Sequence, residues 1–523
     1  MCTALSTRWC PRCGGAACCA PSSAMAGCGR TWPTSDMRTV RFGAEAPSVS
    51  DIVAVAEGAP VELDGDARAT ITASRAVVDR AIESGEAVYG LNRRLGAGRD
   101  DTVEADDLAA FQRRTIANHR GGIGEPLTET EARAVVAARL AGFTRGGAGV
   151  RPELAEAYAA LLNAGVTPRI PSRGSVGAAD LTALAEVAAV VIGTGTVLRD
   201  GGALPAAEAL EAAGLTPIEL APHEALAALS ANALSVGVGS LAAVAARQLA
   251  EAADLVVALS LEAVAAHGPA GNLSPYAEAV AEARGGDGQR ASAHAIRAAL
   301  SGSALEAPGR TVSVQDPLAF RTAPQLHGAL REAVARLRSE LEVELAARTE
   351  NPVVDLPSGR LVSGGNFQAL PLALALENLR LALAHVAEAS ERRAAALSLA
   401  LAPARREGRT RVPGLLLYAA ADAVAEVRQL AAPATLGSST LSGVEDHATY
   451  APLALRLLQR SLALTGDVLA VEALHAADLL GVLDAAPTGA GTRPLASALT
   501  AALAADAAPA AALVAEATHL LLG

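Results

Sequence analysis

Apolar and polar positions recur along most of the chain at the spacing of an α-helix, in segments separated by Gly- and Pro-rich stretches. Residues 66–84 begin at Asp66 and place apolar side chains at helical spacing, which predicts a helix. Residues 324–348 and 371–397 predict two longer helices, the second rich in Leu and Ala and polar toward its end. Helices this long and apolar usually bury themselves in a bundle or an oligomer interface. The pattern therefore predicts a helix-rich protein.

The β-type pattern is confined to short runs. Residues 41–42, 60–63 and 353–362 suggest small hairpins only. Gly and Pro mark the loops, among them a Gly- and Arg-rich loop at 89–101 and a longer one at 268–290. The strands are too few and too short to form the core.

A membrane-spanning segment does not fit the pattern, because no stretch offers about 20 uninterrupted apolar residues. The best run, 241–267, is broken by Arg247, Glu251, Asp254 and Glu262. We therefore interpret it as a buried helix of a soluble protein. With 523 residues the chain is long enough to bury a large core.

Composition changes abruptly near the N-terminus. All six cysteines lie at or before Cys28, and both tryptophans and all three methionines fall among the first 37 residues. Cys10 and Cys13 form a C-x-x-C pair, but a zinc site is weakly supported without a second pair or a nearby His, and we predict no metal. We interpret residues 1–36 as an extension outside the fold, with Met37 as the natural start. The remainder has no cysteine and no sign of an oxidising compartment, so we expect a cytoplasmic protein.

The charged residues argue against a nucleic-acid partner and exclude one catalytic mechanism. The net charge is −12 and there is no Lys/Arg block, which argues against a nucleic-acid partner. The chain has arginine throughout and no lysine, which excludes a Schiff-base mechanism on a lysine amine.

The most informative segment is 174–181, which reads Gly-Ser-Val-Gly-Ala-Ala-Asp-Leu. It closely resembles a loop of the aromatic amino acid ammonia-lyases, the histidine, phenylalanine and tyrosine ammonia-lyase family, which reads Gly-Ser-Val-Gly-Ala-Ser-Gly-Asp-Leu. In that family Ala-Ser-Gly cyclises and dehydrates into the electrophile methylidene-imidazolone. The present loop is one residue shorter and lacks both the Ser and the Gly.

Further motifs follow in the family's order. Segment 88–92 resembles the family's Tyr-Gly-Val-Asn loop, which implies that Tyr89 is the catalytic base on a mobile lid and that Asn92 binds substrate. Arg93 and Arg94 stand where the family has Thr-Gly. Their guanidinium groups either lower the pKa of the Tyr89 phenol or are solvated loop charges.

Two motifs imply residues that bind the substrate. Asn118-His119 stands where the family has Ser-His, which implies that His119 lines the active site; the alternative is a buried structural histidine. Segment 314–321 matches Gln-Asp-x-Tyr-Ser-Leu-Arg, with Leu318 in place of the tyrosine, and implies that Arg321 grips the substrate carboxylate, followed by Gln325 as a further substrate-binding residue. A planar guanidinium can hold a carboxylate bidentately, although a structural salt bridge is the alternative.

The remaining motifs concern the ring pocket and the amine. Segment 364–367 matches Gly-Asn-Phe and implies that Phe367 lines the ring pocket, unless it is a plain core aromatic. Segment 444–447 matches Gln-Glu-Asp-His and implies that Glu445 faces the substrate amine; a capping or salt-bridged glutamate is the alternative. Ser230 stands where the family has an Asn that supports the cofactor's carbonyl, and it is a shorter, weaker replacement unless Asn232 reaches the same place.

The losses concentrate around the cofactor. Ring closure needs a backbone nitrogen to attack the carbonyl two residues earlier, which is easiest for Gly because a Cβ crowds the tight turn. The serine must then lose water, but Ala179 has no hydroxyl and Asp180 stands where Gly is needed. We therefore predict that the loop of Gly177, Ala178, Ala179 and Asp180 is degenerate, that it forms no methylidene-imidazolone, and that the chain uses no cofactor.

The resemblance also implies the architecture. It covers residues 37–523 as a mainly α-helical ammonia-lyase fold with a bundle of long helices and small β-hairpins. We divide it into an N-terminal active-site part (37–230), a central helical bundle (231–480) and C-terminal helices (481–523). The family forms homotetramers whose active sites take residues from three subunits.

Two functions from different classes follow. The first is a carbon–nitrogen lyase-type, addition or isomerisation enzyme on an amino acid or amino-acid-like acid, with Tyr89, Arg321 and Glu445 meeting across chains. Without the ring, such an enzyme needs a substrate whose proton is already acidic or whose leaving group is already good. The alternative is an inactive homologue that binds a ligand or serves as a structural subunit. The chain retains Tyr89, Arg321 and Glu445 together, which favours the enzyme. A third, smaller possibility is an altered but ordinary ammonia-lyase.

Overall fold

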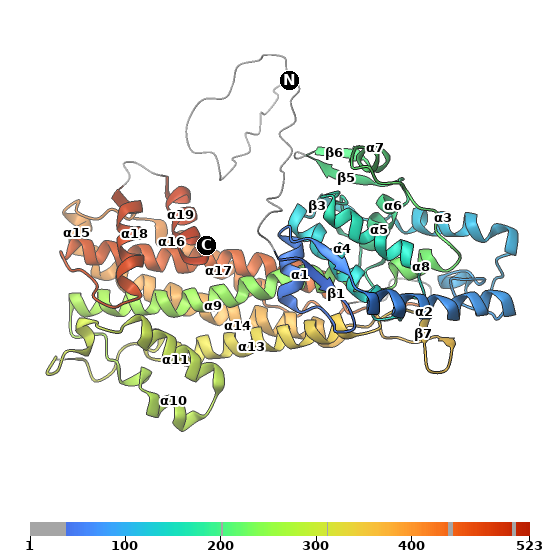
Figure 1. The fold of residues 1–523 in the computed structure, drawn as a ribbon. Coiled ribbons are helices and arrows are strands. Elements are labelled where there is room, and N and C mark those ends of the chain that lie inside the picture. The colour runs from blue at the N-terminus through green and yellow to red at the C-terminus, as the bar shows by residue number, and fades with distance from the viewer. Residues whose placement is uncertain (1–37, 200–201, 311, 438–442, 505–508) are drawn as a thin grey trace, which may run out of the picture.

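The computed structural model describes residues 38–199, 202–310, 312–437, 443–504 and 509–523 (Figure 1). The extension predicted at residues 1–36 lies outside this part of the chain. The described residues are mainly helical, which confirms the predicted fold class.

Long helices running side by side form the elongated body of the molecule (Figure 1). They are α9 (Ala233–His267), α13 (Ala323–Ala346), α14 (Leu370–Ala400) and α17 (Ala451–Val482). The most extensive packing joins α14 to α17, and both also contact α9. In α13 the buried Leu330, Leu337 and Leu341 recur at helical spacing, so one apolar stripe faces the bundle. The predicted helices at 324–348 and 371–397 are thereby confirmed, each to within a few residues.

Shorter helices cover the bundle away from the N-terminal part. α16 (Leu416–Leu430) packs against α14 and α17, and α18 (Thr492–Ala504) and α19 (Ala510–Leu522) pack on α17. α11 (Asp287–Ala299) packs against α13 and α9, next to α10 (Glu278–Arg284). The remaining short helices there are α12 (Leu318–Arg321), α15 (Ala402–Arg406) and the 3-10 turns η3 (Ser274–Tyr276) and η4 (Ala304–Glu306).

The N-terminal part gathers at one end of the bundle (Figure 1). Its helices are α1 (Val49–Ala56), α2 (Gly65–Ser84), α3 (Leu108–His119), α4 (Glu129–Thr144), α5 (Pro152–Asn163), α6 (Leu181–Val191), α7 (Ala206–Ala212) and α8 (Glu224–Leu229), with the 3-10 turns η1 (Gly96–Gly98) and η2 (Ala105–Asp107). α2 confirms the helix predicted at 66–84. Thr128 and Glu131 form a capping box at the start of α4, whose buried face packs on α9 and joins the two parts.

The strands occur in pairs. β1 (Val40–Phe42) pairs in parallel with β2 (Val61–Leu63), and three antiparallel pairs join β3 (Ile123–Pro126) to β4 (Pro171–Arg173), β5 (Thr196–Arg199) to β6 (Gly202–Pro205) and β7 (Val353–Asp355) to β8 (Arg360–Val362). The hairpin predicted at 353–362 is confirmed. The expectation of hairpins only is wrong for β1 and β2, because α1 connects them and brings them together side by side.

The loop predicted at 268–290 is partly wrong. Within it α10 runs from Glu278 to Arg284 and ends at Gly285, whose φ of 82° is the left-handed conformation that closes a helix. α11 then begins at Asp287. The Gly-rich run there marks a junction between two helices and not a continuous loop.

α14 is the one helix, within the described residues, whose length and composition would allow it to cross a membrane. It packs against α13, α16 and α17 and contributes buried side chains along its whole length, which is the setting of a core helix. The run at 241–267 lies in α9 and is mostly buried, as predicted.

Candidate active site

A cavity of about 510 Å³ lies where the N-terminal part meets the bundle. Seven segments contribute to its wall: the loop after α2, α3, the loop before α6, the end of α8, and the segments around 351, 367 and 445. Its lining residues are Tyr89, Arg94, Leu95, Gly96, Phe111, Thr115, Asn118, His119, Gly121, Gly174, Ser175, Val176, Ala178, Ala179, Leu181, Thr182, Leu226, Ser230, Asn351, Phe367 and Glu445.

Tyr89 is held by its own loop. Its phenol oxygen accepts a hydrogen bond from the backbone N–H of Gly96 at 3.0 Å. Burial raises the pKa of Tyr89 above its ordinary value, the Gly96 N–H opposes that shift, Glu445 adds to it and Arg99 opposes it. Tyr89 is therefore a protonated phenol near neutral pH.

The two arginines after Asn92 lie in different surroundings. Arg93 donates to the Thr102 hydroxyl at 2.9 Å, and Arg94 lines the cavity. The amide of Asn92 is used inside the loop, where it accepts from Val88 N–H and donates to Glu86 O, both at 2.8 Å. Arg94 thus lines the cavity, whereas the side chain of Asn92 stabilises the loop and does not line the cavity.

His119 ends α3 and lines the cavity. Its Nδ1 lies 2.7 Å from the backbone carbonyl of Thr115, which can only accept. In the neutral ring this places the proton on Nδ1 and leaves Nε2 as an acceptor. A structural contact on one nitrogen therefore leaves the other available for chemistry.

The degenerate loop is clamped from the segment that carries Glu445. The hydroxyl of Thr449 donates to Gly177 O at 2.9 Å, and Tyr450 N–H donates to Val176 O at 2.8 Å. Gly177 has φ 81°, and a Cβ there would lie 2.1 Å from the Thr449 hydroxyl. Ala179 also has a left-handed φ of 59°, which is uncommon for a residue with a side chain. The loop is a fixed wall of the cavity.

Asp180 anchors this loop to the start of α9. Its N–H donates to Ala231 O at 2.8 Å, and its carboxylate accepts from Ser235 N–H at 2.8 Å. Burial raises its pKa to about 6 despite these donors. Nearby, Asn232 donates to Glu344 at 3.1 Å, and burial raises the pKa of Glu344 to about 7.

Because Asp180 reaches toward α9, its side chain does not cap α6. Leu181 and Thr182, the first residues of α6, line the cavity, so the positive end of that helix dipole lies at its wall. The Thr182 hydroxyl lies 2.9 Å from that of Ser175. This wall can stabilise negative charge that develops on a bound molecule.

The wall also contains Phe367, Glu445, Ser230 and Asn351. The backbone N–H of Asn351 donates to the Ser230 hydroxyl at 2.9 Å, so these two residues are joined directly. Asn351 and Thr182 were not predicted as site residues, and Arg94 was predicted only as a possible influence on Tyr89 or a solvated charge. Each lies within or beside a motif that resembles the family, and this adjacency was the only available signal.

Arg321 and Gln325 do not line this cavity within the chain. Arg321 ends α12, where Arg393 donates to Ala319 O at 2.9 Å and Tyr276 donates to Phe320 O at 2.6 Å. The expectation that the three catalytic candidates come from different chains is wrong for Tyr89 and Glu445, because one chain folds both onto the same cavity.

Known proteins resemble this chain in sequence and in fold. Residues 48–501 match the family model described as aromatic amino acid lyase. The histidine ammonia-lyase of Anaeromyxobacter sp. (strain K) is 38% identical over 464 residues, which cover 85% of this chain and 90% of that protein. The chain belongs to the aromatic amino acid lyase family.

Solved structures add to the comparison. The ergothioneine-degrading enzyme ergothionase of Treponema denticola superposes with a TM-score of 0.86 at 26% identity, covering 92% of this chain and 98% of that one. The tyrosine aminomutase of Streptomyces globisporus gives a TM-score of 0.83 at 27% identity, covering 93% and 97%. The chain is accordingly a lyase of the carbon–nitrogen type, in a family that normally uses methylidene-imidazolone.

Proposed function

We propose that this aromatic amino acid lyase acts on an amino acid or amino-acid-like acid, by elimination or by a related addition or isomerisation, without methylidene-imidazolone. One observation carries the proposal. Tyr89, His119 and Glu445 line a single cavity together with a loop in which Ala178 and Ala179 offer no hydroxyl.

The residues at 177–180 do not fit the ring. The nitrogen that would have to attack belongs to Asp180, and its N–H is already donated to Ala231 O. Asp180 also has a Cβ, and its carboxylate is bound to Ser235 at the start of α9. Ala179 has only a methyl group where a hydroxyl would have to leave. These contacts support an open-chain loop.

The side chains of the cavity support a division of roles. Tyr89 is the base that removes the β-proton, with Gly96 N–H and Arg99 assisting its anionic form. Glu445 binds the substrate amine. The Nε2 of His119 accepts a hydrogen bond from the substrate, and Phe367 packs against its ring or chain. The N-terminus of α6 stabilises the anion that forms when the proton leaves.

The missing electrophile restricts the substrate. Each 1.36 kcal/mol of lost transition-state stabilisation slows a reaction about tenfold, so an unactivated amino acid would react very slowly. We therefore infer a substrate with an acidified β-proton or with a quaternary ammonium that leaves as a neutral amine. An ergothioneine-degrading enzyme is among the similar structures, which makes ergothioneine the first acid to assay, and L-histidine, the substrate named for the histidine ammonia-lyases, is the unactivated comparison.

A direct test combines turnover with mass. The protein is incubated with L-histidine, ergothioneine and a panel of other amino acids, and release of the amine and of the unsaturated acid is measured. We expect turnover of an activated acid by a protein whose intact mass equals the encoded mass. A mass two waters lower, with the ring's near-ultraviolet absorbance, would show an ordinary ammonia-lyase instead.

Assembly completes the proposed site. Arg321 is absent from the cavity of its own chain, so we infer a homo-oligomer, as a tetramer, in which another subunit supplies it as the carboxylate clamp together with Gln325. The Nε of Arg321 and the Oε1 of Gln325 are buried and have no hydrogen-bond partner within the described chain. Leu370, Leu374 and Leu381 are exposed on α14 at spacings that suit one helix face. Light scattering checks the assembly, and a monomer would contradict it.

The competing function is an inactive homologue that serves as a ligand-binding or structural subunit. Arg321→Ala separates the enzyme from a purely structural subunit, and turnover by the wild type separates it from a ligand-binding one. The enzyme loses thermal stabilisation by carboxylate ligands, whereas a scaffold shows no change in ligand behaviour. We further infer a cytoplasmic location, because the chain has no cysteine after Cys28.

A further inference from the structure

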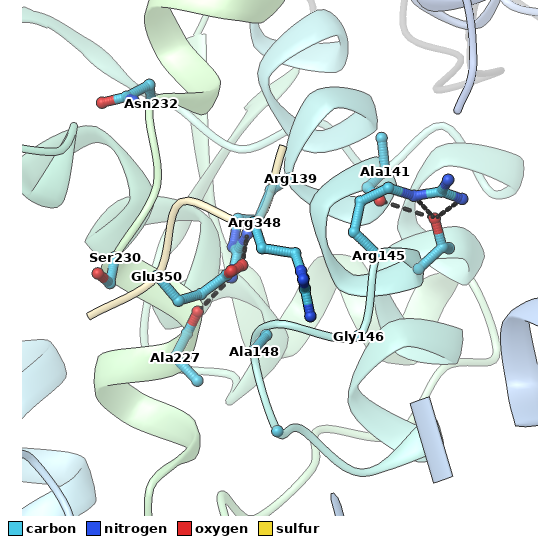
Figure 2. Close-up of polar contacts among 12 residues, drawn as sticks. Arg139, Ala141, Arg145, Gly146, Ala148, Ala227, Ser230, Asn232, Arg348 and Glu350 are labelled. Atoms are coloured by element: carbon cyan, nitrogen blue, oxygen red, sulfur yellow. Dashed lines mark hydrogen bonds and ion pairs between the residues drawn. The ribbon is translucent and has the colours of Figure 1, made fainter. Parts of the chain in front are cut away.

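A buried ion pair lies behind the wall of the cavity (Figure 2). Arg139 of α4 and Glu350 meet at 3.0 Å between Nη1 and Oε1, and their side chains are 1% and 2% exposed. The guanidinium carbon of Arg139 lies 4.2 Å from the centre of the Phe143 ring, which packs edge-on against Tyr158. The site that is already described does not use this pair.

The pair joins segments that form the cavity. A second N–H of Arg139 donates to the backbone carbonyl of Ala227 in α8, the residue after Leu226. On the other side, Glu350 precedes Asn351, whose N–H binds the Ser230 hydroxyl. Leu226, Ser230 and Asn351 all line the cavity. Arg139 therefore links the backbone at Ala227 to the segment that carries Glu350 and Asn351. These two segments carry the cavity-lining residues Leu226, Ser230 and Asn351.

Close backbone approach keeps the pair in place. A Cβ on Gly142 would lie 2.6 Å from Nη1 of Arg139, and a Cβ on Gly147 would lie 2.4 Å from Oε2 of Glu350. A side chain at either position would therefore have to displace one of the charged groups. The same packing leaves Nε of Arg139 and Oε2 of Glu350 without a hydrogen-bond partner in the described chain.

Such a pair is a poor device for stability alone. The desolvation of two buried charges can exceed their attraction, and a hydrophobic pair of similar volume is often as stable. The planar guanidinium group of Arg139 fixes geometry instead, because it binds a carboxylate and a backbone carbonyl at the same time and at defined angles.

We propose that Arg139 and Glu350 are positioning residues for the cavity wall of Leu226, Ser230 and Asn351. The proposal rests on the proposed function for its kinetic consequences only. The pair acts through the backbones of Ala227 and Asn351 and does not touch the substrate.

The test compares Arg139→Met/Glu350→Met, which removes both charges together, with the matched control Arg133→Met. Arg133 lies on the same helix, is 2% exposed and donates to the backbone carbonyls of Val55, Ala56 and Leu162, none of which lines the cavity. Melting temperature, hydrogen exchange of peptides covering 226–232 and 347–353, and kcat and KM are measured for each variant. Arg139→Lys tests whether charge without the planar guanidinium group is sufficient.

We expect exchange at 226–232 and 347–353 to rise about tenfold in the double variant and in Arg139→Lys, and not in Arg133→Met. We expect kcat/KM to fall about tenfold in the same two variants, while the melting temperature of the double variant stays near that of the wild type. Unchanged exchange at both peptides overturns the proposal, as does faster exchange with unchanged kinetics. If no acid is turned over by the wild type, the proposed function fails, and exchange alone decides on the positioning role.

Discussion

The phenol oxygen of Tyr89 accepts a hydrogen bond from the backbone N–H of Gly96, seven residues later in the same loop. The loop therefore closes on the group that it carries, and it does so at the edge of a cavity that also contains Glu445. Burial raises the pKa of the phenol, so the one donor that favours its anionic form comes from the backbone next to it. Base strength and loop closure are coupled in this arrangement.

The first prediction concerns that base. Tyr89→Phe removes the phenol, and we expect kcat to fall by about 10²–10⁴-fold, the usual contribution of a general base. Because the pKa of Tyr89 is raised, kcat/KM of the wild type should still be rising toward the alkaline limit of the assay. Tyr418→Phe is the matched control, since Tyr418 is 70% exposed on α16. Full activity in Tyr89→Phe would remove the assignment.

A second prediction follows from the carboxyl of Glu344, whose pKa is raised from 4.5 to about 7 by burial. A carboxyl with a raised pKa in the folded state contributes stability that is present below 4.5 and lost as pH rises through 7. The wild type should therefore lose unfolding free energy as the pH rises from 4.5 to 7. We expect Glu344→Gln to reduce this loss by on the order of 1–3 kcal/mol. Asp180, with a pKa of about 6, preserves part of the slope.

Urea unfolding at a series of pH values measures the effect of Glu344→Gln. Glu342→Gln on the same helix is the control, because Glu342 is solvent-exposed and paired with Arg338 at 2.9 Å. Equal pH slopes in the two variants would contradict the raised pKa of Glu344.

Much of the site could be predicted because its residues stand in motifs with a fixed order. Tyr89, His119, Phe367 and Glu445 are far apart in sequence, and the resemblance identified each of them from its neighbours. Helices such as α2 could be predicted from local periodicity alone, because the apolar side chains that face the core recur in the sequence at helical spacing.

What could not be predicted depends on contacts between distant segments. The pairing of β3 with β4 joins residues 45 to 50 positions apart, and nothing local in either strand specifies its partner. From its position in the sequence, Asp180 could be predicted only to block ring closure, whereas in the fold it also anchors the loop to Ser235. Arg321 does not line the cavity of its own chain. Its position is set by the packing of α12, which the motif around Arg321 does not specify.

The third prediction tests the clamp on the degenerate loop. Gly177→Ala places a Cβ 2.1 Å from the Thr449 hydroxyl at a φ of 81°, so both the space and the backbone conformation oppose it. We expect a loss of about 1–3 kcal/mol of unfolding free energy, together with weaker ligand binding. Gly165→Ala is the control, because its φ of 67° is similar but nothing lies within 4 Å of the added Cβ. Equal losses in the two variants would show that backbone strain alone, and not the clamp, accounts for the effect.

The last prediction asks whether the missing hydroxyl is the only barrier to the ring. Ala179→Ser restores a hydroxyl at the position that lacks one, but the following nitrogen still belongs to Asp180 and still donates to Ala231 O. Cyclisation would have to break that hydrogen bond, detach the Asp180 carboxylate from Ser235, and accept a Cβ in the tight turn. We therefore expect the intact mass of Ala179→Ser to equal its encoded mass, with no new near-ultraviolet absorbance. Ala178→Ser, which places the hydroxyl one residue earlier, should behave in the same way, and loss of two waters from Ala179→Ser alone would show that the anchor of Asp180 does not prevent closure.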